Sequence, residues 1–437
     1  MAQAFLTHTL QPETLQLSLD FMRLQAAWLA SLVSLPAAEA TAAFEAVPAF
    51  VVLDMCFWLK FVATHKVDEL AMQPLHATVA ALARLLRAGS DALSGGKRLI
   101  RSPLVLAELV STLYYCVVPP HSRRETSSAL GGPPGWGASP GSRLSSAVLG
   151  ADGARAQLPL PLAAAYKAVD AVEGLDVDAI EAEGFEKFGV RAQLNTLLLQ
   201  LWALDDCRPA LVDAAREPPG APGREVILGL GHAMLDTLLY QLDEALKRIR
   251  EVNMADWNAE ADGTLAHNQG YIRHLLEGST STLELLRKLT AQPPLAAVFA
   301  APPIGPRTAS VALRFTDMLC GPKATQLKLR GGSADVGFNP RSLLSGLAEA
   351  LLHCAAASDG FGRLLAMDVD LEMPVLRKLS RIVEREHLLQ PPQLTALAAL
   401  LTDVEGHCAA RSAQDHAHAA ATAPAGGGGG GGGSGGG

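Results

Sequence analysis

The chain has 437 residues and a formal net charge of −8 at pH 7, and 49% of its residues are hydrophobic. This size and apolar content suffice for two or three average domains or for one long stack of helices. The lack of a dominant basic stripe argues against a nucleic acid partner. Only 5% of the residues are aromatic. Because Leu and Ala carry most of the apolar content, helix packing is favoured over sheets.

The N-terminal part is predicted to be helical with a short break. Residues 1–34 show a helical but imperfect apolar pattern, and residues 34–39 interrupt it. Pro48 then restarts a helix. The side chains expected on the buried side of that helix are Val52, Met55, Cys56, Leu59 and Val62.

The most apolar stretch, residues 46–62, is interrupted by Asp54 and Lys60. It is shorter than the roughly 20 apolar residues that a membrane span needs, so we expect a buried helix of a soluble protein. The first basic residue other than His8 is Arg23, which argues against an export signal.

The next segments are an amphipathic helix over residues 72–86, a polar loop over residues 87–97 and a second helix. Ser102 is predicted to cap that second helix, and Pro103 to occupy its first position. The residues expected on its apolar face are Leu106, Leu109, Val110 and Leu113.

The composition changes after Val118. Residues 131–141 consist almost entirely of Gly, Pro, Ser, Ala and Trp, a composition that sustains neither helix nor strand. We therefore expect residues 125–157 to form a disordered insertion.

Helices are then predicted over residues 158–169, 185–202, 228–252, 277–289, 373–387 and 393–405. The clearest is 228–252, where Leu235, Leu238, Leu239, Leu242, Leu246, Ile249 and Val252 form one stripe. On its polar side, Asp243 with Lys247 and Glu244 with Arg248 are spaced as helical ion pairs. Residues 293–307 are expected to be a Pro/Ala linker.

Residues 314–352 are predicted to form a helix, a sharp corner and a second helix. Gly321 is expected to close the first helix in the left-handed conformation, and Pro322 cannot continue it. Asn339 then offers an N-cap oxygen, and Pro340 occupies the first position of the second helix. The apolar face of the second helix comprises Leu343, Leu344, Leu347 and Leu351.

From Gly406 the composition turns to Ala and His and then to almost pure Gly, so residues 406–437 are expected to be a disordered tail. The density of helices and the short breaks between them predict an all-α, elongated solenoid, although no repeat of fixed period is visible.

Short catalytic patterns in the chain lack the context that their chemistry needs. Residues 137–141 fit Gly-x-Ser-x-Gly, but a nucleophile elbow joins a strand to a helix, and Pro140 with its Gly neighbours rules out that helix start. Residues 94–97 fit Ser-x-x-Lys in a polar loop. They are also no phosphate-binding loop, because Asp91 stands at the first Gly position and Arg98 replaces Ser/Thr.

Cysteine chemistry is the main enzymatic alternative. The six cysteines are Cys56, Cys116, Cys207, Cys320, Cys354 and Cys408, and none forms a Cys-x-x-Cys pair. Buried, reduced thiols of a cytoplasmic or nuclear protein are the favoured interpretation. Cys320, close to Lys323, could act as a nucleophile that carries an acyl group as a thioester only if its thiolate were exposed and stabilised by positive charge. The apolar residues around it favour packing instead.

Two further groups of side chains were weighed as sites. His407, Cys408, His416 and His418 contain donor types that bind metal, but a solvated tail explains them better. Arg98 and Arg101 are interpreted as a solvated lead into a helix rather than as an anion site. No catalytic, cofactor-binding or metal-binding residue is therefore assigned.

The motif Leu-Cys-Gly-Pro-Lys at residues 319–323, followed by Gly-Phe-Asn-Pro-Arg-Ser-Leu-Leu at residues 337–344, resembles the core region of the ubiquitin conjugation factor E4 family, which elongates ubiquitin chains. Further similar stretches in the same order are residues 43–62, 98–110, 185–202 and 228–252. The resemblance extends from about Ala43 to Glu405. Ala49 stands where the family usually has an acidic residue, and Ser102 replaces an Asn of similar capping ability.

The resemblance implies an armadillo-like scaffold that performs no covalent catalysis. Its implied partners are a hexameric segregase ATPase and ubiquitinated substrates. In the family a C-terminal U-box recruits the ubiquitin-conjugating enzyme, and no U-box motif follows Glu405 here. We expect either a truncated gene model or a core-only paralogue, with the conjugating enzyme as a partner only if a U-box is supplied.

These expectations divide the chain into an N-terminal helical part (residues 1–124), the insertion (125–157), a C-terminal helical part (158–405) and the tail (406–437). The expected function is a ubiquitin chain-elongation core in proteasomal and ER-associated degradation, located in cytoplasm and nucleus. By resemblance the activity would be that of a ubiquitin-ubiquitin ligase, although no catalytic module is visible. The alternative is an unrelated helical-repeat adaptor in transport or tethering.

Overall fold

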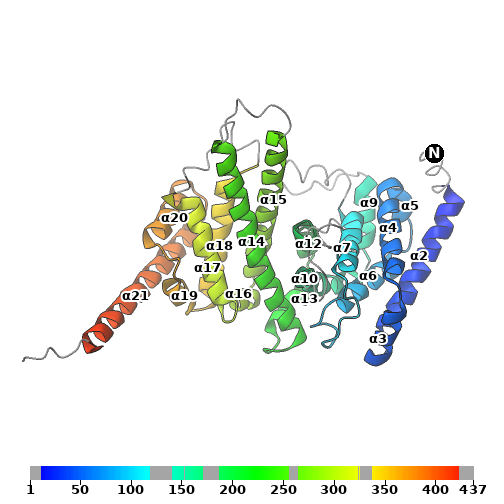
Figure 1. Ribbon diagram of the computed structural model, residues 1–437, viewed down its shortest axis with the longest axis horizontal. Coiled ribbons are helices and arrows are strands. Elements are labelled where there is room, and N and C mark those ends of the chain that lie inside the picture. Colours follow the sequence, from blue (N-terminus) through cyan, green and yellow to red (C-terminus); the bar gives the residue numbers. More distant parts are fainter. Residues whose placement is uncertain are drawn as a thin grey trace, which may run out of the picture.

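The computed structural model describes residues 11–118, 140–151, 153–170, 187–254, 264–322, 324 and 337–422. Within these ranges the chain forms eighteen α-helices and one 3-10 helix, and no strand. Figure 1 shows the helices side by side along one long axis, with α2 at one end and α21 at the other. The predicted all-α, elongated architecture is confirmed.

The helices follow one another with short connections. In the first half they are α2 (Pro12–Val33), α3 (Ala37–Ala46), α4 (Ala49–His65), α5 (Val67–Ala71), α6 (His76–Ala88), α7 (Pro103–Val117), α9 (Pro140–Leu149), η1 (Arg155–Gln157), α10 (Pro159–Ala168) and α12 (Lys187–Trp202). In the second half they are α13 (Arg208–Arg216), α14 (Pro222–Met254), α15 (Thr264–Thr290), α16 (Pro293–Ala300), α17 (Gly305–Cys320), α18 (Pro340–Ala357), α19 (Phe361–Met367), α20 (Met373–Arg385) and α21 (Pro391–Thr422).

Packing runs from one end of the molecule to the other. Helix α2 lies on α6, α4 lies on α7, and α10 connects both to α14. The long helices α14 and α15 then pack on each other, α15 packs on α18, and α21 closes the far end against α19 and α20. The buried apolar residues form one continuous cluster from α2 to α21, so each helix is stabilised mainly by its neighbours in the stack.

Local sequence signals begin the helices as expected at two places. In α7, the backbone N–H of Val105 donates to Ser102 Oγ over 3.4 Å. In α18, the N–H of Ser342 donates to Asn339 Oδ1 over 3.2 Å. The apolar faces predicted for α4, α7 and α18 are all buried.

The insertion expected over residues 125–157 is wrong from Pro140 onward. Pro140 begins α9, as proline can at a first helical position. Leu144 and Val148 of α9 are each 1% exposed, and the helix packs on α5 and α7. The Gly- and Pro-rich composition before α9 led to the prediction of disorder, but burial of the apolar face of α9 against its neighbours stabilises the helix. Residues 119–139 lie outside the described residues.

Three further boundaries differ from prediction. The Pro/Ala linker expected over residues 293–307 is instead α16 and the start of α17. Each of these helices has a proline at its first or second position, where proline is compatible with a helix. The tail expected from Gly406 continues α21 as far as Thr422. The amphipathic helix expected to start at Met72 begins at His76, after Pro74.

Gly321 does not have the predicted left-handed conformation. Its φ is −67° and its ψ is −177°. The ring of Pro322 accounts for this, because a residue before proline is pushed out of helical conformations towards extended ones. The helix therefore ends where expected, but through the proline rather than through a glycine cap.

No single described helix is long and apolar enough to cross a membrane, whereas α3 and α4 would satisfy the length and composition together but are bent by 78° relative to each other.

Candidate functional site: a groove between α14 and α17

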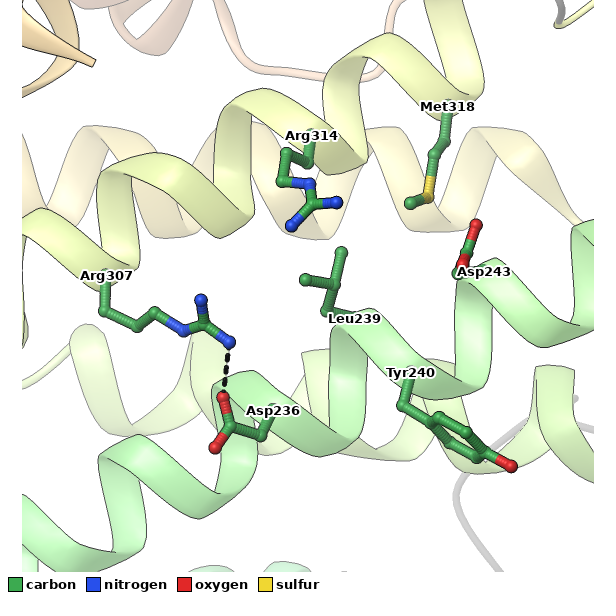
Figure 2. A pocket seen from close by; sticks show the side chains of 7 residues that line it. All are labelled: Asp236, Leu239, Tyr240, Asp243, Arg307, Arg314 and Met318. Atoms are coloured by element: carbon green, nitrogen blue, oxygen red, sulfur yellow. Dashed lines mark hydrogen bonds and ion pairs between the residues drawn. The ribbon is translucent and has the colours of Figure 1, made fainter. Parts of the chain in front are cut away.

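A groove of about 380 Å³ runs between α14 and α17. One wall is formed by Asp236, Leu239, Tyr240 and Asp243 of α14, and the other by Arg307, Arg314 and Met318 of α17. Figure 2 shows Leu239 and Asp243 of α14 facing Arg314 and Met318 of α17, while the Tyr240 ring points away from α17. Residues seven apart lie on one face of a helix, so α14 presents two carboxylates to the groove and α17 presents two guanidinium groups.

Both arginines of the groove form ion pairs with aspartates. Arg307 Nη2 lies 2.6 Å from Asp236 Oδ1, which closes one end of the groove (Figure 2). Arg314 Nε lies 3.8 Å from Oδ2 of Asp370, which precedes α20. The two arginines thus connect α17 to helices on both sides, and all four side chains remain roughly half exposed to solvent.

Apolar and aromatic side chains lie between the charges. Leu239 and Met318 come from opposite walls (Figure 2). The Tyr240 ring stacks on Phe188 of α12, with centroids 4.4 Å apart and planes inclined by 4°. The residue Tyr240 nevertheless stays 44% exposed. A rigid, half-exposed aromatic ring beside paired charges is a typical composition for a protein-binding surface.

This arrangement suits docking of another protein. Arginine offers planar, two-pronged hydrogen bonding to carboxylates, and aspartate accepts from lysine or arginine. A partner segment with both signs of charge and an apolar side chain between them would match the two walls.

The sequence identified α14 and the C-terminal part of α17, but neither the first turns of α17 nor the groove itself. Asp243 was expected to pair with Lys247, yet Lys247 Nζ lies 3.6 Å from Glu244 Oε2 and Asp243 lines the groove. The expected pair of Glu244 and Arg248 is present at 2.9 Å. The seven-residue spacing of Asp236 with Asp243, and of Arg307 with Arg314, was the available signal. It shows a shared face but not which helix lies opposite.

Cys320, the candidate nucleophile, is the last residue of α17 and is 1% exposed. Burial raises the pKa of its thiol to about 11, because desolvation outweighs the opposing charge of Lys378. At neutral pH only about one thiol in ten thousand would be ionised. Lys323 lies outside the described residues. The site therefore has the character of core packing.

We expect one cysteine of the native chain to react readily with a thiol reagent. Cys408 is partly exposed, whereas Cys56, Cys116, Cys207, Cys320 and Cys354 are buried. Counting modified thiols by mass spectrometry should give about one per chain, since reaction requires an accessible thiolate. Cys408→Ser should remove that reaction and Cys320→Ala should leave it unchanged. Fast labelling of Cys320 would contradict the packing role.

The remaining candidates from the sequence do not come together as a site. Arg98 Nη2 lies 2.8 Å from Asp91 Oδ2, and Arg101 Nη2 lies 3.9 Å from Glu45 Oε1. Both arginines thus have acidic neighbours within the chain.

The donor types considered for metal binding are dispersed. His407 Nε2 lies 3.4 Å from Asp403 Oδ1 on the next turn of α21. The side chains of His416 and His418 are outside the described part of the chain. Where side chains are described, no three or more His, Cys, Asp or Glu residues gather in a group that could hold a metal ion.

Glu277 on α15 is a half-buried carboxylate whose pKa is raised. Burial raises its pKa from 4.5 to about 7, and Arg273 opposes this only in part. The folded chain therefore binds this proton more tightly than the unfolded chain. The resulting stabilisation is complete below pH 4.5 and is lost as the pH rises through about 7.

We expect Glu277→Gln to stabilise the chain at pH 8 by about 1–2 kcal/mol, a value reduced for solvent access to this half-buried group. The gain should vanish below pH 4.5, where the wild-type carboxyl is also neutral. Urea unfolding at several pH values measures it. Glu39→Gln, at an exposed position of α3, is the control and should show no such pH dependence.

In a comparison with known protein families, residues 2–405 match the ubiquitin elongating factor core. The match includes the described helices from α2 to α20, both walls of the groove and the first part of α21, as far as residue 405. It agrees with the resemblance carried by residues 319–323 and 337–344, and it extends that resemblance to the N-terminal helices. A ubiquitin elongating factor works on ubiquitin chains, and this all-helical core is its scaffold, with ubiquitin and ubiquitin-bearing proteins as the class of partner. The chain belongs to the ubiquitin elongating factor core family.

Proposed function

We propose that this chain holds ubiquitinated substrates during chain elongation and that it acts in proteasomal and ER-associated degradation. The observation that carries the proposal is the family match over residues 2–405. The stacked helices supply a long, rigid support, and the buried Cys320 thiol supports a role without a covalent ubiquitin intermediate.

A segregase ATPase that extracts ubiquitinated proteins is the second partner that we propose, with cytoplasm and nucleus as the locations. The groove between α14 and α17 is the surface that we assign to ubiquitinated substrates. Its alternating charges provide orientation and its apolar residues provide contact area, which are separate contributions to recognition.

The groove assignment is tested by capture of ubiquitin chains on the purified chain. Arg314→Glu and Asp243→Lys each reverse one charge of the groove, so each should weaken capture about tenfold or more. Arg216→Glu, at an exposed position of α13 outside the groove, is the matched control and should bind as wild type. Equal binding by all three variants would remove the groove from the proposal.

The scaffold role is tested by reconstitution. The chain mixed with activating enzyme, conjugating enzyme and ubiquitin should by itself lengthen no chain, whereas efficient autonomous elongation would contradict the proposed role. Co-purification from cells should recover the segregase and ubiquitin conjugates. Recovery of transport or tethering factors in their place would favour the adaptor function.

A further inference from the structure

The outer face of α2 carries a row of large apolar side chains in contact with solvent. Leu17, Phe21, Leu24 and Trp28 are 73%, 59%, 67% and 46% exposed. Their spacing of four, three and four residues places all four on one narrow stripe of the helix. We call these four residues the α2 stripe.

The opposite face of the same helix is already used. Leu15, Leu19, Ala26 and Leu29 are at most 7% exposed, and this face packs on α6. Helix α2 therefore has two apolar seams, one buried within the chain and one open. A helix needs only one such seam to be held in a stack.

The location of the α2 stripe makes it unusual. Figure 1 shows α2 at the end of the molecule, with no labelled helix beyond it. Terminal helices of stacked folds normally present a polar outer face, and contiguous exposed apolar patches of several hundred square ångströms mark interaction sites. With about 200 Å² for a large apolar side chain, the exposed fractions leave on the order of 500 Å² of open apolar surface.

We propose that the α2 stripe is covered by the α2 stripe of a second copy of this chain, with the two helices antiparallel about a twofold axis. Three features favour this occupant, and the first is the spacing. The order four, three, four reads the same in both directions, so a reversed copy presents matching positions. In antiparallel pairing Leu17 faces Trp28 of the second copy, and Phe21 faces its Leu24.

The second feature is size complementarity. Each layer of the antiparallel pair combines one aromatic with one leucine, so the four layers have similar volumes. Parallel pairing would instead place Trp28 against Trp28 and Leu17 against Leu17.

The third feature is area. A standard interface buries about 800 Å² of each partner, and homodimer interfaces are about 65% apolar, which gives about 520 Å² of apolar surface per partner. The open apolar surface of the α2 stripe, on the order of 500 Å², is close to this area.

The charges beside the α2 stripe are compatible with self-association. Arg23 Nη2 and Asp20 Oδ1 form an exposed ion pair at 3.0 Å near the middle of the helix. The proposed axis passes between these two residues along the helix. Arg23 of one copy can therefore also approach Asp20 of the second copy. No net charge at the centre opposes the pairing.

The first test is the mass of the full chain in sedimentation equilibrium at micromolar concentrations. We expect a reversible dimer of twice the 45.8 kDa chain mass. Leu24→Glu should weaken dimerisation about 100-fold, with an unchanged circular dichroism spectrum because the residue is exposed. Val369→Glu makes the same kind of change at a residue that is 96% exposed near the other end, and it should dimerise as wild type.

The second test checks the antiparallel pairing through charge rescue. Phe21→Asp and Leu24→Lys should each be monomeric alone, since each places a charge against an apolar side chain. Mixed together they should form a heterodimer, because Asp at 21 then faces Lys at 24 of the other copy while the remaining Leu24 and Phe21 still meet. In a parallel pair, position 21 faces position 21 and position 24 faces position 24 of the other copy. The introduced Asp and Lys would then not face each other, and mixing would not restore dimerisation.

A wild-type chain that stays monomeric over this concentration range would overturn the proposal, as would a dimer unaffected by Leu24→Glu. Neither result bears on the capture of ubiquitin chains by the groove, so the two proposals fail independently. Binding of a different protein to the α2 stripe of a monomeric chain would assign this surface to that partner instead.

Discussion

Replacing Phe315 by alanine is expected to lower the free energy of unfolding by about 4 kcal/mol, within the range for aromatic side chains removed from a core. Phe315 lies in α17 and is 0% exposed. Helix α17 packs on α14, α16, α18, α19 and α20, so the cavity would open where several helices meet. Neighbours held on all sides collapse little into such a cavity, which keeps the cost high.

Urea unfolding followed by circular dichroism measures this change. Phe57→Ala removes the same side chain from a residue of α4 that is 50% exposed, and this control should lose less than about 1 kcal/mol. Because α17 also forms one wall of the groove, Phe315→Ala should weaken capture of ubiquitin chains, whereas Phe57→Ala should not. A loss below about 1 kcal/mol for Phe315→Ala would show that this region is loosely packed.

Removing Asp170 is expected to have the second-largest effect, a loss of about 3 kcal/mol. Its carboxylate contacts Nη2 of Arg191, whose side chain is only 3% exposed. Arg191 Nη1 also donates to Thr237 Oγ1 over 2.7 Å, and its guanidinium lies 5.3 Å from the centre of the Tyr166 ring. Arg191 thereby joins α12 to α10 and α14. An arginine cannot lose its proton, so Asp170→Ala leaves a buried charge without its counterion.

The matched control for Asp170 is Asp205→Ala. Asp205 pairs with Arg208 at 3.2 Å, but its side chain is 95% exposed, so its removal should change the unfolding free energy by less than about 0.5 kcal/mol. The Asp170→Ala effect should persist in high salt, because Arg191 is buried while Asp170 is 38% exposed, and a partly buried pair is screened less than a surface pair. Equal effects of the two changes would mean that water reaches Arg191 freely.

Much of the helical structure was accessible from the sequence. The buried side of α4, the caps of α7 and α18 and the stripe of α14 all follow from apolar spacing and from Ser, Asn and Pro at helix starts. These are local signals, since a helix hydrogen-bonds within itself and its apolar face is written every three or four residues. The errors at α9, α16 and α21 arose where Pro, Gly or Ala dominates the composition.

The candidate site was less accessible. Asp236 and Asp243 could be placed on one face of α14 from spacing alone, whereas Arg307 fell in the expected linker and its shared face with Arg314 became visible only in α17. Nothing in the sequence shows that these faces lie opposite each other, because residues 236 and 307 are brought together by packing through intervening helices. The expected partner of Asp243 was wrong for the same reason.

The sequence by itself determined an all-helical chain, most of its helix starts and its membership of an elongating-factor family, because these depend on short-range patterns and on motifs read along the chain. Only the tertiary structure decided that α9 is part of the core, that charged walls of α14 and α17 face each other, and that Leu17, Phe21, Leu24 and Trp28 remain uncovered. The physical reason is that an apolar stripe has the same spacing whether it is buried or open, and only the neighbouring helices settle which.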